Sequence, residues 1–283
     1  MKLCRFQVGI NSDIRIGLIT NDHTVADTGL QRMATLLERP DLADELTRLL
    51  RAGLPEHPLD TVHLLTPVES QEVWAAGVTY LRSKQARMVE SEFSANAYDR
   101  VYDAVRPEIF FKSLPEKVVS PGDAVGIRSD ARWNVPEPEL ALVINSSGTV
   151  VGFTIGNDMS SRDIEGENLL YLPQAKIYTG SCAVGPWIVV GVTEGDARQW
   201  SIQLEIRREG NTVFSGETQA DKIKRPFHEL VEYLFRSQKF ANGVVLLTGA
   251  GVVPPDTFTL EPGDSVRIRI SGIGSLENPV EVV

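Results

Sequence analysis

The sequence contains few cysteines and no long apolar run. Cys4 and Cys182 are its two cysteines; they could form one bridge, but reduced thiols in a cytoplasmic protein are expected. No apolar stretch approaches the roughly 20 residues that a membrane span needs. Residues 1–6 also lack the apolar core of a signal peptide. We therefore expect a cytoplasmic protein without a membrane partner.

Basic and imidazole side chains are also scarce. The chain has 28 Lys and Arg against 38 Asp and Glu, a formal net charge of −10. This charge argues against nucleic acid or an anionic membrane as the main partner. The four histidines, His23, His57, His63 and His228, belong to no recognisable motif. We interpret them as ordinary surface or packing residues.

Strand-like segments dominate the chain. Residues 1–70 predict a small leading module with a hairpin and two short helices, and the prolines that follow indicate a boundary near residue 70. The remainder, 71–283, is mostly strands joined by Gly, Pro, Asn and Asp turns. Helices are expected over 81–105 and 226–237. The pattern is typical of an α+β protein rich in β-structure.

Two glutamates stand two residues apart at the start of a strand-like run. Glu137 and Glu139 introduce the apolar residues 140–144, and a turn leads to a second such run, 150–155, which Asp158 follows. Residues i and i+2 of a strand face the same side of a sheet. The spacing therefore predicts that the three carboxylates share one face of a hairpin.

The turn decides whether the three groups meet. If it is centred on Ser147 and Gly148, position 137 lies opposite position 158, where facing Cβ atoms are about 5 Å apart. Carboxylates that close repel one another unless a cation joins them. Oxygen ligands without nearby Cys or His favour Mg²⁺, Ca²⁺ or Mn²⁺. Two alternatives stay open: solvated charges at a strand entry, or a loop one residue longer that scatters the three groups.

The order of several motifs from residue 110 onward resembles that of the fumarylacetoacetate hydrolase family. These motifs are Phe110-Phe111-Lys112, the pair of glutamates, Gly156-Asn157-Asp158, Lys176, Gly185-Pro186-Trp187 and Thr248-Gly249. The resemblance implies a mixed β-sandwich roll for residues 71–283 and assembly as a homodimer or homotetramer. It also implies a divalent cation, Mg²⁺ or Mn²⁺, held by Glu137, Glu139 and Asp158.

The chain departs from the hydrolytic members of that family at one place. Those members carry Asn-Tyr-x-x-His with a Glu three residues later, a pair that activates water. Ser83 and Ala86 stand at these positions here, and neither is a general base near neutral pH. The motifs Glu165-Gly166-Glu167-Asn168 and Tyr171-Leu172-Pro173-Gln174 instead resemble the branch that dehydrates 2-keto-3-deoxy sugar acids.

This narrower resemblance implies a reaction. A metal-dependent dehydratase would convert a 2-keto-3-deoxy-pentonate to 2,5-dioxopentanoate, through metal-stabilised enolisation and β-elimination of water. The partner is then a small 2-keto acid.

Three side chains are candidates for moving protons in such a reaction. Lys176 matches the family's site lysine, and Glu165 and Glu167 lie close to it in the sequence. A lysine in a partly buried pocket near a cation has a lowered pKa. The alternative for Lys176 is a permanently charged partner of the carboxylates, and the alternative for the glutamates is solvation at a helix start.

Five residues are candidates for binding the substrate: Arg162, Thr248, Gly249, Ser83 and Arg82. Arg162 stands where the family has an arginine, and its alternative is pairing with Asp163 or with a metal ligand. The family uses a Thr-Gly turn to grip the substrate carboxylate, although Thr248 and Gly249 could form a mere turn. Arg82 and Ser83 lie where the missing dyad would be, or are solvated residues on a helix.

Two other functions stay open on the sequence alone. One is a different reaction of the family on a 2-keto acid, namely acylpyruvate hydrolysis, decarboxylation or isomerisation. The other is a catalytically silent protein that binds a keto acid. Retention of Lys176 with all three carboxylates argues against the silent protein, which has little use for clustered charges.

Overall fold

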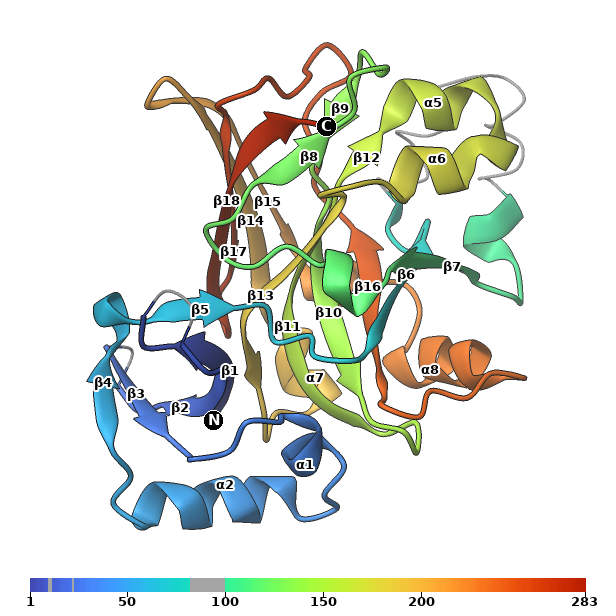
Figure 1. Ribbon diagram of the computed structural model, residues 1–283. Helices are drawn as coiled ribbons and strands as arrows, with labels where there is room; N and C mark the ends of the chain where they lie inside the picture. Colours follow the sequence, from blue (N-terminus) through green and yellow to red (C-terminus); the bar gives the residue numbers. More distant parts are fainter. Residues whose placement is uncertain (10–11, 22, 82–99) are drawn as a thin grey trace.

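A large mixed sheet forms the centre of the molecule (Figure 1). The computed structural model describes residues 1–9, 12–21, 23–81 and 100–283. Within these residues the sheet has eleven strands: β1 (Lys2–Gln7), β2 (Arg15–Ile19), β3 (Thr24–Asp27), β4 (Glu56–Pro58), β5 (His63–Leu65), β6 (Glu72–Gly77), β7 (Glu108–Ser113), β10 (Pro138–Ile144), β11 (Val150–Asp158), β13 (Cys182–Val189) and β16 (Val244–Ala250). Their spatial order is β4-β3-β2-β1-β13-β11-β10-β16-β6-β7, with β5 beside β1. The β16–β6 pair is parallel, whereas neighbours such as β10 and β11 are antiparallel.

A second, smaller sheet packs against the first. It comprises five strands within the described ranges, in the order β15-β14-β17-β18-β8. Their bounds are β8 (Val125–Ile127), β14 (Ser201–Arg208), β15 (Asn211–Gln219), β17 (Ser265–Ile270) and β18 (Gly274–Val282). A short ribbon of β9 (Asn134–Val135) and β12 (Ser160–Ser161) lies near the end of β10.

Short helices lie at the edges of the sheets. In the described part of the chain they include α1 (Ala34–Leu37), α2 (Leu42–Arg51), α5 (Arg162–Glu167), α6 (Leu172–Lys176), α7 (Glu194–Ala197) and α8 (Phe227–Phe235), with single 3₁₀ turns at η1 (Leu59–Thr61), η2 (Pro115–Lys117), η3 (Leu169–Tyr171) and η4 (Ala220–Lys222). The helix expected over 226–237 is confirmed by α8. Most of the helix expected over 81–105 falls on residues 82–99, outside the described residues.

The main core fills the space between the two sheets. Leu142 of β10 and Phe153 of β11 share one buried cluster with Leu204 and Ile268 of the second sheet. Because side chains alternate across a strand, every second residue of β10 points into this core. The prediction of a β-rich α+β fold built as a mixed β-sandwich roll is confirmed.

The strands of residues 1–70 join the rest of the large sheet through β1, where Lys2 lies opposite Val189 of β13. Helix α2 covers this end of the sheet, and its Leu46 packs in a cluster with Ile188 and Leu3. The division into residues 1–70 and 71–283 stays a prediction about which part of the chain folds by itself.

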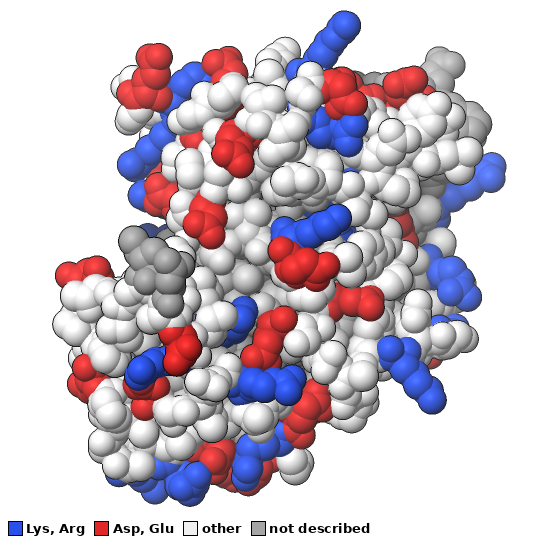
Figure 2. Space-filling view, viewed as in Figure 1, with Lys and Arg blue, Asp and Glu red and all other residues white. Residues whose placement is uncertain are grey.

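The surface carries both signs of charge. On the face that Figure 2 shows, acidic and basic side chains are intermixed rather than segregated into large patches. Among the helices in the described part of the chain, none is both long and apolar enough to cross a membrane.

Candidate metal centre

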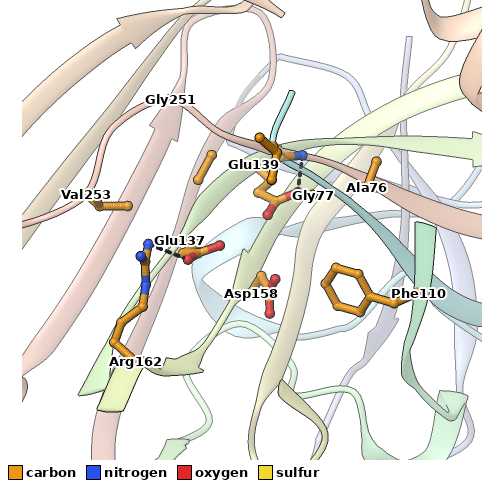
Figure 3. Close-up of a pocket in the computed structure, with 12 residues that line it drawn as sticks. Ala76, Gly77, Phe110, Glu137, Glu139, Asp158, Arg162, Gly251 and Val253 are labelled. Atoms are coloured by element: carbon orange, nitrogen blue, oxygen red, sulfur yellow. Dashed lines mark hydrogen bonds and ion pairs between the residues drawn. The ribbon is translucent and has the colours of Figure 1, made fainter. Parts of the chain in front are cut away.

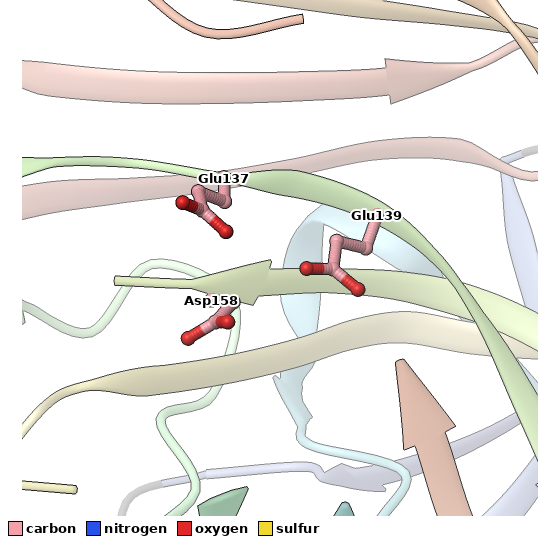
Figure 4. Close-up of side chains that lie close together, drawn as sticks. All are labelled: Glu137, Glu139 and Asp158. Atoms are coloured by element: carbon pink, nitrogen blue, oxygen red, sulfur yellow. The ribbon is translucent and has the colours of Figure 1, made fainter. Parts of the chain in front are cut away.

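Glu137, Glu139 and Asp158 form one buried cluster at the ends of β10 and β11 (Figure 4). Pro138 lies opposite Asn157 in the ladder, and the backbone N–H of Asp158 donates a hydrogen bond to the Glu137 carbonyl at 3.0 Å. One carboxylate oxygen from each residue lies within 4.8 Å of the others. The predicted register, with position 137 opposite position 158, is therefore confirmed.

Burial excludes the alternative of solvated charges at a strand entry. The exposed fractions are 4 % for Glu137 and 1 % for both Glu139 and Asp158. Strand alternation explains where the groups point: Leu140 faces the core between the sheets, whereas Ala141 packs with Leu247 on the opposite face. Residue 139 has the same parity as Ala141, so the carboxylates project on that second face, away from the main core.

Cationic side chains meet these carboxylates, among them Lys176 and Arg162. Nζ of Lys176 lies 3.0 Å from Oε2 of Glu137, 2.9 Å from Oδ2 of Asp158 and 2.6 Å from Oγ of Ser160. Arg162 donates from Nη2 to the other oxygen of Glu137, Oε1, at 2.7 Å. The pairing of Lys176 with carboxylates and of Arg162 with a predicted metal ligand agrees with the alternatives that the sequence left open. This pairing leaves open the roles with substrate that the sequence predicts for Lys176 and Arg162.

The acidity of Glu139 is strongly perturbed. Complete burial, and then the charges of Asp158 and Glu137, raise the pKa of the Glu139 carboxyl well above its usual range. The backbone N–H of Gly249 opposes this shift by donating to Oε2 of Glu139. Gly249 has φ +94, and a Cβ there would lie 2.1 Å from Oγ1 of Thr79. A glycine is therefore required where the main chain approaches Glu139.

A pocket opens beside the three carboxylates (Figure 3). Its lining includes Glu137, Glu139, Asp158, Arg162, Phe110, Gly77, Gly249 and Gly251. The pocket combines an acidic floor with an arginine and a phenylalanine ring at its sides. A small anionic molecule that also coordinates a cation fits this combination of charges.

The donor set fits a hard divalent cation. All three candidate ligands are carboxylate oxygens, which Mg²⁺ and Mn²⁺ accept, whereas zinc sites usually include Cys or His. The raised pKa of Glu139 is a second sign, because such clustered, buried carboxylates are better stabilised by a cation than by one another.

The remaining predicted site residues differ in their burial. Glu165 of α5 is fully buried, whereas Glu167 is exposed, and neither belongs to the pocket lining. Thr248 is buried and its hydroxyl donates to the Leu140 carbonyl at 2.8 Å. Arg82 and Ser83 lie outside the described residues. Their predicted roles stay predictions.

Sequence reasoning gave no role to two residues that contact the cluster. Ser160 meets Lys176 through its hydroxyl, and Lys112 of β7 meets Asp158 in an ion pair. The signal for Lys112 was present, because a lysine ends the apolar run 109–111 of a strand. A charge in such a run needs a buried partner.

Most of the chain matches the model of one known protein family. A family model described as "Fumarylacetoacetate (FAA) hydrolase C-terminal" matches residues 72–281. The chain is 43 % identical over 271 residues to the "Probable 2-keto-3-deoxyxylonate dehydratase" of Haloferax volcanii, covering 93 % of both chains. It is 40 % identical over 244 residues to the "2-dehydro-3-deoxy-D-arabinonate dehydratase" of Saccharolobus solfataricus, covering 85 % of this chain and 82 % of the other.

Solved structures agree with these relatives. One of them is "2-keto-3-deoxy-D-arabinonate dehydratase complexed with magnesium and 2,5-dioxopentanoate". It superposes with a TM-score of 0.81 at 33 % identity, over 100 % of this chain and 99 % of the other. The likeness thus extends over the whole fold, including residues 1–70.

Proposed function

The chain belongs to the fumarylacetoacetate hydrolase family, and we propose that it is a magnesium-dependent dehydratase of a 2-keto-3-deoxy-pentonate. The product is 2,5-dioxopentanoate, and Mn²⁺ is the alternative metal. The reaction removes one water: C3 loses a proton, C4 loses its hydroxyl, and the resulting enone tautomerises so that C5 becomes an aldehyde.

One observation carries this proposal. A buried trio of carboxylates lies on the floor of a pocket that also contains Arg162, in a fold shared with a dehydratase solved with magnesium and 2,5-dioxopentanoate. Glu137, Glu139 and Asp158 would hold a divalent cation, which would supply Lewis-acid chemistry at the keto group and so favour enolisation.

The protein's own side chains would orient the substrate and move its protons. Nζ of Lys176 is an ammonium beside Glu137 and Asp158 in this structure. We propose that it would lose a proton when a cation takes over these carboxylates, and that the neutral amine would take the proton from C3. Arg162 lines the pocket, and its guanidinium suits the carboxylate of the keto acid. We propose that Thr248 and Gly249 also bind the substrate; Gly249 lines the pocket and its N–H donates to Glu139.

Two further assignments belong to the same proposal. Glu165 is buried on the helix that Arg162 begins, so we propose Glu165 rather than the exposed Glu167 as the acid that helps the C4 hydroxyl leave. Arg82 and Ser83 are proposed to bind the C4 and C5 hydroxyls. Ser83 and Ala86 replace the water-activating pair of the hydrolytic members, which supports elimination over hydrolysis.

We also propose a cellular setting. Cys4 and Cys182 are free, buried thiols, which fits a reducing compartment such as the cytoplasm. Assembly into a homodimer or homotetramer is proposed from the resemblance to the family, and sedimentation of the purified protein tests it.

A coupled assay tests the proposed reaction. Purified protein with Mg²⁺ is offered 2-keto-3-deoxy-arabinonate or its C4 epimer, and an aldehyde dehydrogenase reports 2,5-dioxopentanoate through NAD reduction. We expect aldehyde from at least one epimer and none after chelation of the metal. Absence of aldehyde from both epimers, together with pyruvate release from an acylpyruvate, would instead identify a hydrolase.

A further inference from the structure

We propose that Lys112 is a positioning residue of this site, which holds Asp158 and the main chain of Lys176 in their working arrangement. The inference rests on the proposed function. Lys112 contacts Asp158 and two main-chain carbonyls, and the proposal gives it no contact with substrate. Its influence must pass through the residues that it contacts.

The ammonium group of Lys112 has three buried oxygen neighbours. Its side chain is fully buried, and Nζ donates to the Met159 carbonyl at 3.0 Å and to the Lys176 carbonyl. The third partner is Oδ1 of Asp158, met as an ion pair rather than with the direction of a hydrogen bond. Two of the three donors of the ammonium are thus used in hydrogen bonds to carbonyls, and the Asp158 carboxylate balances its charge.

Each of the two lysines, Lys112 and Lys176, contacts a different oxygen of the Asp158 carboxylate. Lys112 contacts Oδ1, and Lys176 contacts Oδ2 at 2.9 Å. The carboxylate is therefore fixed in rotation, because neither oxygen can turn without leaving a buried ammonium short of a partner. Lys112 thereby sets which oxygen faces Glu137 and the pocket.

The same ammonium also joins two separate elements. Met159 follows directly after β11, and Lys176 is the last residue of α6. By bonding both carbonyls, Lys112 fixes the point on the main chain from which the Lys176 side chain reaches the carboxylates. Misplacement of a reacting group by about 1 Å can lower the rate about 100-fold. Loss of the Lys112 hydrogen bonds to these two carbonyls should therefore lower turnover.

Steady-state kinetics of matched variants test this role. The set is Lys112→Met, Lys176→Met, the double variant, and Lys117→Met, which removes the same charge from the exposed residue Lys117. We expect Lys112→Met to lower kcat by about 100-fold while its affinity for Mn²⁺ changes by less than about tenfold. The double variant should be no slower than Lys176→Met, because residues that act as one unit are non-additive. Lys117→Met should behave as wild type.

Other results would overturn the proposal. A wild-type kcat in folded Lys112→Met would reduce Lys112 to a structural role, whatever the loss in Tm. Additive losses of kcat in the double variant would show that Lys112 acts independently of Lys176. If Lys112→Met does not fold, Lys112→Gln, which keeps a two-donor amide, replaces it in the same comparison.

A readout that does not depend on turnover separates this inference from the proposed function. The electron paramagnetic resonance spectrum of bound Mn²⁺ reports the symmetry of its ligands. Should the wild type fail to dehydrate any keto acid, the proposed function fails. The comparison of spectra then decides for Lys112: a changed spectrum in Lys112→Met supports positioning of Asp158, and an unchanged one contradicts it.

Discussion

Glu137 and Asp158 face each other across the β10–β11 hairpin, joined by a hydrogen bond of 3.0 Å from the Asp158 N–H to the Glu137 carbonyl. Their side chains lie on the sheet face that looks away from the main core, where Glu139 joins them. A metal site can form here because the ladder brings residues 21 positions apart into direct opposition. The predictions below follow from this arrangement.

Glu139→Gln should abolish both metal binding and turnover without unfolding the protein. The substitution removes one carboxylate oxygen but keeps an oxygen that can accept from Gly249. Because the variant also loses repulsion from Asp158 and Glu137, its Tm without added metal should equal or exceed that of wild type. Mn²⁺ titration and thermal unfolding provide the measurements.

Glu205→Gln is the control for that experiment. Glu205 lies in the second sheet and pairs with Arg207 and Arg267 at the surface. Its loss should change stability by no more than about 0.5 kcal/mol and leave turnover intact. Full activity in Glu139→Gln would show that the metal assignment is wrong.

Metal affinity should rise with pH through the raised pKa of Glu139. Below that pKa, Glu139 holds a proton when no cation is present, so a cation must displace the proton in order to bind. Affinity is therefore lowest on the acid side, where binding releases a proton. Calorimetric titration with Mg²⁺ at several pH values, in buffers of different ionisation enthalpy, measures the affinity and the number of protons released. An affinity that does not depend on pH, with no proton release, would contradict this prediction.

Lys176→Met should destabilise the protein more in the absence of metal than in its presence. The change removes one buried cationic partner from both Glu137 and Asp158, which keep Arg162 and Lys112 respectively, and breaking a buried ion pair costs about 3–5 kcal/mol. Added Mg²⁺ supplies replacement positive charge, so the deficit in Tm should shrink. Thermal unfolding with and without Mg²⁺ checks this, and an equal deficit in both conditions would mean that the cation does not bind beside Lys176.

Cys4 and Cys182 should resist thiol reagents in the native protein. Burial raises the pKa of each thiol to about 12, so almost no thiolate, the reactive form, exists near pH 8. Ellman's reagent should modify neither thiol until denaturant is added and both thereafter. Fast reaction of Cys182 in the native state would contradict this prediction.

The sequence predicted the centre of the site better than its surroundings. Glu137, Glu139 and Asp158 were predictable because strand periodicity and a short turn determine the register locally. The contact of Lys112 with Asp158 was not, because it joins β7 to the end of β11, segments that are not neighbours in the large sheet. A pairing of this kind depends on how the sheet packs against α6, which no local pattern encodes.

The same contrast holds for the candidate carboxylates Glu165 and Glu167. They are two residues apart on α5, yet one is buried and the other exposed. In a six-residue helix next to a sheet, the face that packs inward is set by tertiary contacts. The sequence therefore offered both as acids, and burial distinguishes them.

The position of solvent hydrogen in the product tests the central claim most directly. In D₂O with Mg²⁺, abstraction at C3 followed by tautomerisation should give 2,5-dioxopentanoate with deuterium at both C3 and C4, and Glu139→Gln should form none. Proton NMR of short incubations resolves the two carbons. Product with deuterium at C4 alone would mean that C3 is never deprotonated, and would contradict a site built around an enolising cation held by Glu137, Glu139 and Asp158.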